Sequence, residues 1–322
     1  MEFKHTPVLC KECIFYLKIN PDGIYVDCTL GGGGHARAIA ECLDSGTLIG
    51  IDQDLAAIDA ASATLPGFKC KIILERDNFA NIRDILARVN IAKVDGFLLD
   101  LGVSSNQLDN AERGFSYMRN ADLDMRMDDR NSLTAFQIVN TYDEKQLTKI
   151  FFDYGEERFS KRISKAIIKA RSLRPLRTTF ELTDIIKSSM PRKSKEGGSH
   201  PAKRVFQAIR IEVNGELAAL TLALSDMIGL LAPGGRICVI SYHSLEDRIV
   251  KQCFKSWCNP CTCPPRYPCI CGLEPMVKSI SKKPITPGAS EVEYNHRSRS
   301  AKLRVVEKLV AENRDEVDSK GI

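Results

Sequence analysis

The chain has 322 residues, of which 43% are hydrophobic and 27% charged, and a formal net charge of +5. These values are typical of a soluble globular protein with enough residues for two domains. No apolar run approaches the roughly 20 residues of a membrane span, and the N-terminus has no signal-peptide core, so neither membrane insertion nor secretion is indicated. We therefore expect a cytoplasmic protein without a membrane partner.

The first chemical signal is a short apolar run that ends at Asp27 and opens onto the consecutive glycines Gly31–Gly34. This pattern predicts a strand, a tight turn and a helix start, an arrangement in which the backbone passes close to a nucleotide-like ligand. A second apolar run ends at Asp52 and Asp54, where comparable folds place a ribose-binding carboxylate. The opening of the chain therefore predicts a site for an adenosyl cofactor.

Strand-like and helix-like segments alternate from residue 20 to residue 104. The repeated strand–helix units predict an α/β fold with a parallel, doubly wound sheet and helices on both faces. Ligands bind such a sheet beyond the carboxyl ends of its strands, so we expect Asp27, Asp52 and Asp100 to share one crevice. Besides the strand before the glycines, we expect strands at 48–52, 71–74 and 96–102, and helices at 36–42, 56–64 and 79–89.

Residues 108–214 show helical periodicity and no convincing strand; Phe159, Ile163, Ile167 and Ala170 form one apolar stripe. The earlier alternation then resumes. Because it is interrupted only once, we predict a helical insertion at 108–214 within a sheet domain made of residues 1–107 and 215–322. The resumed part is expected to contain helices at 216–231 and 244–257, and strands at 232–241 and 301–306.

Positive charge is concentrated in two places, Arg158–Arg177 and His296–Arg304, and neither contains an acid. Like-signed blocks suit a polyanion such as nucleic acid. A charge run taken alone is more often a solvated helix face, and that interpretation is favoured unless another signal points to nucleic acid.

The glycine turn alone fits a dinucleotide as well as a methyl donor, so its neighbours decide between them. Asp27 precedes the first glycine by four residues, as in the acid–glycine motif of class I S-adenosylmethionine (SAM) methyltransferases, and the turn Pro233–Gly235 before a late strand also resembles that class. Nearby carboxylates would help to retain the sulfonium cation of SAM. SAM is therefore favoured over a nicotinamide cofactor.

A specific family resemblance rests on Asp100–Gln107 (DLGVSSNQ) and Glu112–Arg119 (ERGFSYMR), with further matching segments in order along nearly the whole chain. With these motifs the chain resembles the bacterial ribosomal RNA small-subunit methyltransferase H family, also called RsmH or MraW. The resemblance implies a class I, Rossmann-like methyltransferase sheet with an inserted helical domain. It also implies methyl transfer from SAM to N4 of one cytidine in the decoding region of 16S ribosomal RNA. The further segments are Leu123–Asp128, Tyr154–Phe159, Arg204–Ile211, Ser241–Lys251 and Arg297–Arg304.

The resemblance implies no catalytic metal, and it assigns cofactor-binding residues by motif position. Asp52 would accept hydrogen bonds from the ribose hydroxyls, Phe79 would stack near adenine, and the glycine turn would approach the methionine portion. The helical domain and the two basic stretches would hold 16S ribosomal RNA of the small ribosomal subunit. The implied cofactor residues are Gly32, Gly33, Gly34, His35, Asp52, Phe79, Asp100 and Gln107.

Two residues have candidate catalytic roles with alternatives left open. Asp100 ends the expected fourth strand, where it either contacts the cofactor or polarises the N4 amine of cytidine by accepting its hydrogens. His243 either contacts the cytidine or its phosphate, or bonds to nearby backbone. We expect Ser244 to cap the following helix, with Asp247 as the acid at its third position.

A group of cysteines lies close together in the sequence near the end of the chain. The spacings C-x-x-C and C-x-C can supply thiolates to a structural zinc ion. No histidine accompanies them and the spacing does not fit a standard zinc ribbon, so reduced cysteines or an adventitious metal site are favoured over zinc. The candidate ligands are Cys258, Cys261, Cys263, Cys269 and Cys271.

Two rival functions remain. A DNA amino-methyltransferase would use the same chemistry, but the chain lacks a DPPY-like tetrapeptide after the expected fourth strand. A non-catalytic RNA-binding assembly factor would keep the fold while losing the cofactor pocket, whereas the residues expected to form that pocket are all present.

Overall fold

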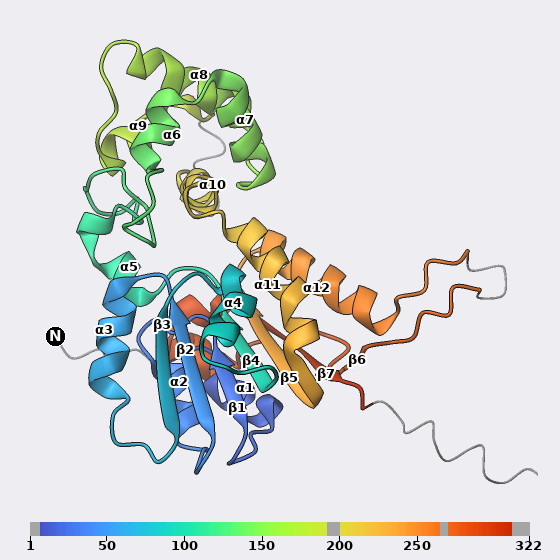
Figure 1. Ribbon diagram of the computed structural model, residues 1–322. Helices are drawn as coiled ribbons and strands as arrows, with labels where there is room; N and C mark the ends of the chain where they lie inside the picture. Colours follow the sequence, from blue (N-terminus) through green and yellow to red (C-terminus); the bar gives the residue numbers. More distant parts are fainter. Residues whose placement is uncertain (1–6, 192–199, 265–269, 311–322) are drawn as a thin grey trace, which may run out of the picture. The chain divides into compact units, whose positions relative to one another are not determined.

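The structure is a computed structural model that describes residues 7–191, 200–264 and 270–310 (Figure 1). The chain divides into two compact units, and each has its own core of buried apolar side chains. The first, here called the sheet unit, consists of Met1–Asp52, Ala56–Gly102 and Leu220–Ile322. The second, the helical unit, consists of Gln53–Leu55 and Val103–Ala219.

Seven strands form the sheet, in the order β3-β2-β1-β4-β5-β7-β6 (Figure 1). The first five strands pair in parallel, and β7 runs antiparallel to both β5 and β6. The predicted α/β fold is confirmed, and the predicted parallel pairing holds for β1 to β5, whereas β7 makes the sheet mixed. The strands span Ile24–Asp27 (β1), Thr47–Asp52 (β2), Lys71–Arg76 (β3), Val94–Asp100 (β4), Leu231–Ser241 (β5), Val277–Ser279 (β6) and Lys302–Lys308 (β7).

Strand side chains alternate between two apolar layers, one on each face of the sheet. Phe97 and Leu99 of β4 lie in the layer that α4, α11 and α12 cover, while Leu98 lies in the layer that α1, α2 and α3 cover. A strand covered on both faces must be apolar at every position, which explains the unbroken apolar runs of the sequence. The helices around the sheet span Cys10–Leu17 (α1), Gly34–Ala40 (α2), Leu55–Thr64 (α3), Ile82–Arg88 (α4), Glu216–Leu230 (α11), Ser244–Cys258 (α12) and Ala289–Tyr294 (α13), with short 3-10 helices at Phe79–Asn81 (η1) and His296–Ser300 (η4).

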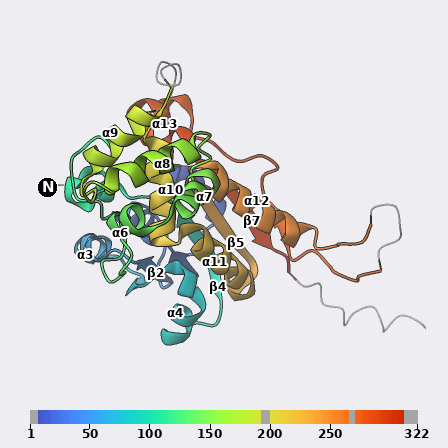
Figure 2. The ribbon, with the colours of Figure 1, turned by 90° about the horizontal axis from the view of Figure 1, so that it is seen from above.

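The helical unit packs its helices around a separate core. Its helix α7 lies beside α8, and α8 lies beside α9 (Figure 2). Ile163 and Ile167 of the predicted apolar stripe are fully buried in this core. Within 103–191 and 200–219 the structure contains no strand, so the predicted helical character is confirmed. The elements span Ser105–Asp109 (α5), Ala111–Arg113 (η2, 3-10), Ala135–Thr141 (α6), Glu144–Asp153 (α7), Ser160–Arg171 (α8), Thr179–Ser189 (α9) and Lys203–Asn214 (α10).

In the sheet unit, the sequence did not predict the short elements α1, β6, α13 and η4. Helix α1 follows Leu9 and precedes Lys18, both in the left-handed region with φ of 52° and 51°, and no side chain caps its start. It therefore lacks the usual start and stop signals. Strand β6 has three residues, too few for a periodicity.

A search of the described ranges for a membrane-crossing helix finds none that is long and apolar enough on its own; only α10 and α11, taken together across their break, meet both criteria.

Candidate active site

Hydrogen bonds with Thr29 and Gly31, in and just before the glycine turn, connect the acids that end β1, β2 and β4. The Gly31 amide donates to Asp52 Oδ2 at 2.9 Å, and the Thr29 amide donates to Asp27 Oδ1 at 3.1 Å. The Asp100 amide in turn donates to the Thr29 hydroxyl at 2.6 Å. Because β1 lies between β2 and β4, these three carboxyl groups gather at one edge of the sheet.

The glycine turn adopts a backbone that only glycine takes readily. Gly31 has a φ of 49° and Gly33 a φ of 76°, both in the left-handed region. Gly33 stands at the N-cap of α2, Gly34 is the first residue of that helix, and Gly32 is exposed. The turn therefore presents a tight stretch of backbone without side chains, as a close approach to a ligand requires.

Histidine 35 is buried directly after the turn, with 5% of its surface exposed. Its Nε2 lies 3.0 Å from the Val8 carbonyl oxygen, and its Nδ1 lies 3.7 Å from Asp100 Oδ2. Burial lowers the pKa of His35, which favours the neutral ring. With the ring proton on Nε2 for Val8, the Nδ1 lone pair faces the Asp100 carboxyl group.

The two innermost carboxyl groups are costly to ionise in this environment. Burial raises the pKa of Asp100 to about 7, although the Tyr242 hydroxyl donates to its Oδ1 at 2.7 Å and opposes the rise. Burial likewise raises the pKa of Asp27 to about 6. Asp27 Oδ2 is buried and has no hydrogen-bond partner among the described residues. A buried acceptor of this kind is suited to a ligand that brings a positive charge or a donor.

The start of α12 differs from the prediction. His243, and not Ser244, is the N-cap residue: its Nδ1 accepts from the Glu246 amide at 3.4 Å. The Glu246 carboxylate accepts in return from the His243 amide, completing a capping box. Asp247, expected at the third helical position, is not part of this box; it binds Arg304 instead. The predicted Ser244 cap was therefore wrong, and His243 makes the backbone contact that was one of its two alternatives.

The remaining implied cofactor residues lie in different units. Phe79 opens η1, whose start is capped by Asn78, and it packs partly buried against the sheet core. Gln107 belongs to the helical unit, where it is buried and donates to Asp54 Oδ2 at 2.9 Å. Arg113 donates to the same oxygen at 2.9 Å. The glycines, His35, Asp52, Phe79 and Asp100 all belong to the sheet unit.

Tyr242 is a site residue that the sequence reasoning missed. Its hydroxyl binds Asp100, the candidate catalytic acid. The sequence held only part of the signal: Tyr242 directly follows the strand β5, but the sheet order was needed to place β5 next to β4, which ends at Asp100. Residues that follow neighbouring parallel strands meet at the same sheet edge.

The cysteine-rich stretch brings three thiols together. The sulfur atoms of Cys261, Cys263 and Cys271 lie within 4.8 Å of one another. Cys258, at the end of α12, is not part of this group. Cys269 lies outside the described residues.

The two basic stretches differ in how their charges are used. Helix α8 carries exposed basic residues on the sides that face away from its buried stripe, namely Lys161, Arg162, Lys165 and Lys169. In the second stretch, Arg304 and Lys302 bind Asp247 of α12, at 2.7 Å and 3.4 Å. Two cations of this second stretch are therefore paired within the protein, which weakens the expectation that the stretch neutralises phosphates.

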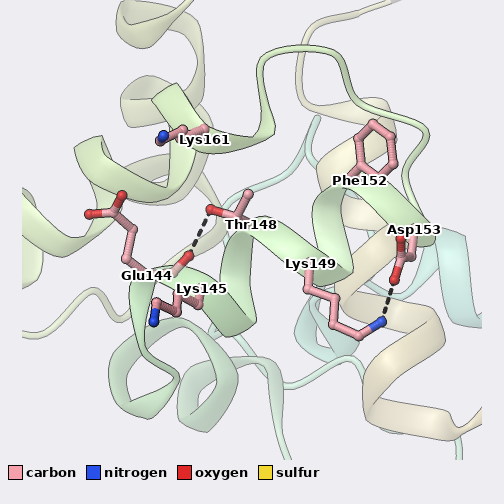
Figure 3. A pocket seen from close by; sticks show the side chains of 7 residues that line it. All are labelled: Glu144, Lys145, Thr148, Lys149, Phe152, Asp153 and Lys161. Atoms are coloured by element: carbon pink, nitrogen blue, oxygen red, sulfur yellow. Dashed lines mark hydrogen bonds and ion pairs between the residues drawn. The ribbon is translucent and has the colours of Figure 1, made fainter.

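A surface hollow of about 690 Å³ lies between α7 and α8 of the helical unit (Figure 3). The Phe152 side chain is 63% exposed there. Lys149 forms an ion pair with Asp153, and Lys145 and Lys161 contribute further positive charge. The full lining is Glu144, Lys145, Thr148, Lys149, Phe152, Asp153 and Lys161.

The residues at the sheet edge fit SAM. This cofactor has a sulfonium and an ammonium group, both positive, and ribose hydroxyls that donate hydrogen bonds. The orphaned Asp27 oxygen and the Asp100 carboxyl group suit positive charge, and the side-chain-free glycine turn leaves room for close approach. Together with the strand order and the antiparallel β7, this site defines a class I SAM-dependent methyltransferase.

Comparison with known proteins specifies the family. The model of the MraW methylase family matches residues 2–309, and the chain belongs to that family. A protein named ribosomal RNA small subunit methyltransferase H from Clostridioides difficile (strain 630) is 52% identical, over 96% of this chain and 100% of its own. One named ribosomal RNA small subunit methyltransferase H 2 from Agathobacter rectalis is 56% identical, over 96% and 99%. A third, from Clostridium botulinum (strain Kyoto / Type A2), has the first name and is 54% identical, over 96% and 100%.

Proposed function

We propose that the protein transfers a methyl group from SAM to N4 of a cytidine in the decoding region of 16S ribosomal RNA, in the cytoplasm. The observation that carries the proposal is the partly buried Asp100 carboxyl group at the start of the DLGVSSNQ motif, which the Tyr242 hydroxyl binds and whose pKa is raised to about 7. The family and the names of the relatives support an acceptor in ribosomal RNA, not in DNA.

The sheet unit would hold SAM with residues from three strand ends. Asp52, already fixed by the Gly31 amide, has acceptor oxygens for ribose hydroxyls. Phe79 offers an aromatic face for adenine, and Asp27 offers its orphaned oxygen to a positive group. When bound, SAM supplies an electrophilic methyl group on a positively charged sulfur.

Asp100 would act on the amine that receives the methyl group. The N4 lone pair of cytosine is delocalised into the ring, so the amine is a weak nucleophile. A carboxylate that accepts an N4 hydrogen localises this lone pair, and it can hold the proton that the amine loses. A pKa near 7 makes Asp100 a stronger base than an ordinary aspartate, while Tyr242 fixes its orientation.

The helical unit would hold the RNA. Its exposed lysines and arginines on α8 can neutralise phosphates, and exposed Phe152, which lines the same hollow as Lys145 and Lys161, can stack an unpaired base. The target cytidine must be unpaired or flipped, because N4 is engaged in pairing within a duplex. We propose the same role for the whole insertion at 108–214.

The test is mass spectrometry of 16S ribosomal RNA nucleosides from cells with and without this protein. We expect one cytidine to lose its N4 methyl group when the protein is absent, and to regain it when the unmutated gene is restored. Restoration with Asp100→Asn should leave the cytidine unmodified. An unchanged set of N4-methylated cytidines in the deleted cells would refute the proposal.

A further inference from the structure

The described residues between α12 and β6, 259–264 and 270–276, are held at their base by protein contacts but form no apolar core. At this base, the Met276 amide donates to the Trp257 carbonyl oxygen at 2.9 Å. Beyond this contact, the described residues 259–264 and 270–276 contain no helix, no strand and no buried residue. Ordering such a segment costs conformational entropy, and burial of apolar surface does not offset this cost.

Three thiols converge within this segment. The sulfur atoms of Cys261, Cys263 and Cys271 all lie within 4.8 Å of one another, and they come from two chain portions that run away from and back towards the sheet unit (Figure 1). In a tetrahedral zinc site with Zn–S bonds of about 2.3 Å, neighbouring sulfur atoms are roughly 3.8 Å apart. The observed arrangement is therefore compatible with a single ion at its centre.

We propose that Cys261, Cys263 and Cys271 bind one zinc ion through their thiolates, which fill three of its four coordination positions, and that this ion holds residues 259–264 and 270–276 together. Three soft sulfur ligands select zinc over hard cations such as Mg²⁺ and Ca²⁺. Each thiol releases its proton to solvent when it binds the ion. The sequence argument against zinc rested on an unusual spacing and the lack of a histidine. A site made of sulfur alone needs no histidine, and the spatial grouping overrides the spacing.

The cysteines that the proposal leaves out provide matched controls. Cys258 lies in the same stretch of sequence, but it is not in the group, and its thiol lies against the backbone of Ser279. Cys42 is exposed on the sheet unit, far from this segment in sequence. Cys→Ser substitution at either position removes a thiol without removing a proposed ligand.

The test is the zinc content of the full-length protein, purified with a phosphine reductant and passed over a weak chelating resin that strips loosely held ions. We expect about one zinc per chain in the unmutated protein and in Cys42→Ser and Cys258→Ser. Cys261→Ser with Cys271→Ser should lose at least ten-fold, with unchanged far-ultraviolet circular dichroism. A chain without zinc, or a double variant that keeps it, would overturn the proposal.

A cobalt titration gives a second readout that does not depend on enzymatic activity. Cobalt bound by thiolates produces a sulfur-to-metal charge-transfer band in the near ultraviolet and tetrahedral bands in the visible range. We expect both bands in the unmutated protein, Cys42→Ser and Cys258→Ser, and neither band in the double variant. Chymotryptic cleavage after exposed Leu273 should also accelerate when a strong chelator removes the ion; a rate that stays the same would count against a structural role.

Discussion

At the scale of single residues, the site depends on carboxyl groups whose ionisation is opposed by burial. Asp100 and Asp27 both have raised pKa values, of about 7 and about 6, and burial is the main cause for each. The neutral His35 ring presents a lone pair towards Asp100. Without a cofactor, both acids therefore stay protonated to a higher pH than an exposed aspartate does, and a bound positive group would favour their ionised forms.

Asp100→Asn should lower methyl transfer by about 100-fold or more, because the amide cannot accept a proton from the N4 amine. For the unmutated enzyme, the rate at limiting substrate should rise with pH and level off above about 7, since only the ionised Asp100 acts as a base. The measurement is the transfer of a radiolabelled methyl group to small-subunit RNA between pH 5.5 and 9.

Tyr242→Phe is the control for this assignment. The hydroxyl of Tyr242 lowers the pKa of Asp100, so its removal should move the rising limb of the profile to higher pH while preserving activity at pH 9. A purely structural role for Tyr242 would lower activity equally at every pH. A profile that does not move in the variant would contradict titration of Asp100 as the cause of the limb.

Asp27→Asn should stabilise the protein in the absence of cofactor and weaken its binding of SAM. The pKa of Asp27 is about 6 in the folded chain and 3.8 for an ordinary aspartate. The folded state therefore loses stability as the pH rises from 3.8 through about 6, by about 3 kcal/mol in total. The variant should melt at a higher temperature at pH 8, and its advantage should vanish at pH 4.

Thermal unfolding at the two pH values and calorimetric titration with SAM test this pair of effects. Asp44→Asn is the matched control, because Asp44 is an exposed carboxylate on the same unit and should change neither quantity. An Asp27→Asn variant that is less stable than the unmutated protein at pH 8 would show that ionised Asp27 does not destabilise the folded state.

At the scale of elements, the sequence predicted the parallel strands well because each contains an apolar run, and β1, β2 and β4 also end in an acid. It did not predict that β7 runs antiparallel to β5. Nor did it predict the cap of α12. Serine is a preferred cap residue and histidine is not, yet Glu246 lies three residues after His243, which is the spacing of a capping box. That spacing was a usable signal.

For the candidate site, too, some features could be predicted from the sequence and others could not. The position of acids at strand ends placed Asp27, Asp52 and Asp100 at one sheet edge from sequence alone. The contact of Tyr242 with Asp100 joins residues 142 positions apart, and the order of β4 and β5 in the sheet was needed to see it. The sequence named five candidate cysteines, but it could not show which of them come together, because their spacing does not determine how the chain between them folds.

Asp247→Asn should destabilise the sheet unit by about 1–3 kcal/mol, because it leaves partly buried Arg304 without its anionic partner. Asp247 joins α12 to β7, and its cationic neighbours oppose the effect of burial and hold its pKa below the ordinary value of 3.8. The stability it contributes is therefore present above pH 3.8 and is lost as the pH falls further. Urea unfolding at pH 7 measures the difference.

The exposed ion pair of Asp44 with Lys69 supplies the comparison. These side chains are 61% and 81% exposed, against 15% for both Asp247 and Arg304. Asp44→Asn should therefore change the free energy of unfolding by less than about 0.5 kcal/mol. If Asp44→Asn and Asp247→Asn lower the free energy of unfolding equally, the partly buried ion pair between α12 and β7 stabilises the protein no more than an exposed one.

At the scale of the whole molecule, the chain combines a sheet unit that carries the candidate methyl-transfer site with a helical unit that carries exposed positive charge. Lys165→Glu with Lys169→Glu should weaken binding of small-subunit RNA and reduce the slope of its salt dependence by about 2 or more, because two phosphate contacts are lost. SAM affinity should not change. Filter binding between 50 and 300 mM salt measures the slope.

Lys11→Glu with Lys71→Glu changes the net charge by the same amount on exposed lysines of the sheet unit. We expect this control to retain most of the salt slope. If the two double variants lose RNA affinity to the same degree, then overall charge, and not the α8 surface, governs binding.

The helical unit is not continuous in sequence: residues Gln53–Leu55, directly after β2, belong to it. Asp54 in this short segment binds both Gln107 and Arg113. Excision of 103–219 would therefore not leave an intact sheet unit, because it would remove Gln107 and Arg113, two partners of the buried Asp54 carboxylate that stays behind. Transplanting the helical unit onto another methyltransferase would meet the reverse problem, since the recipient would have to supply an acid two residues after its second strand. In evolutionary terms, the two units are expected to be inherited and exchanged only as a pair.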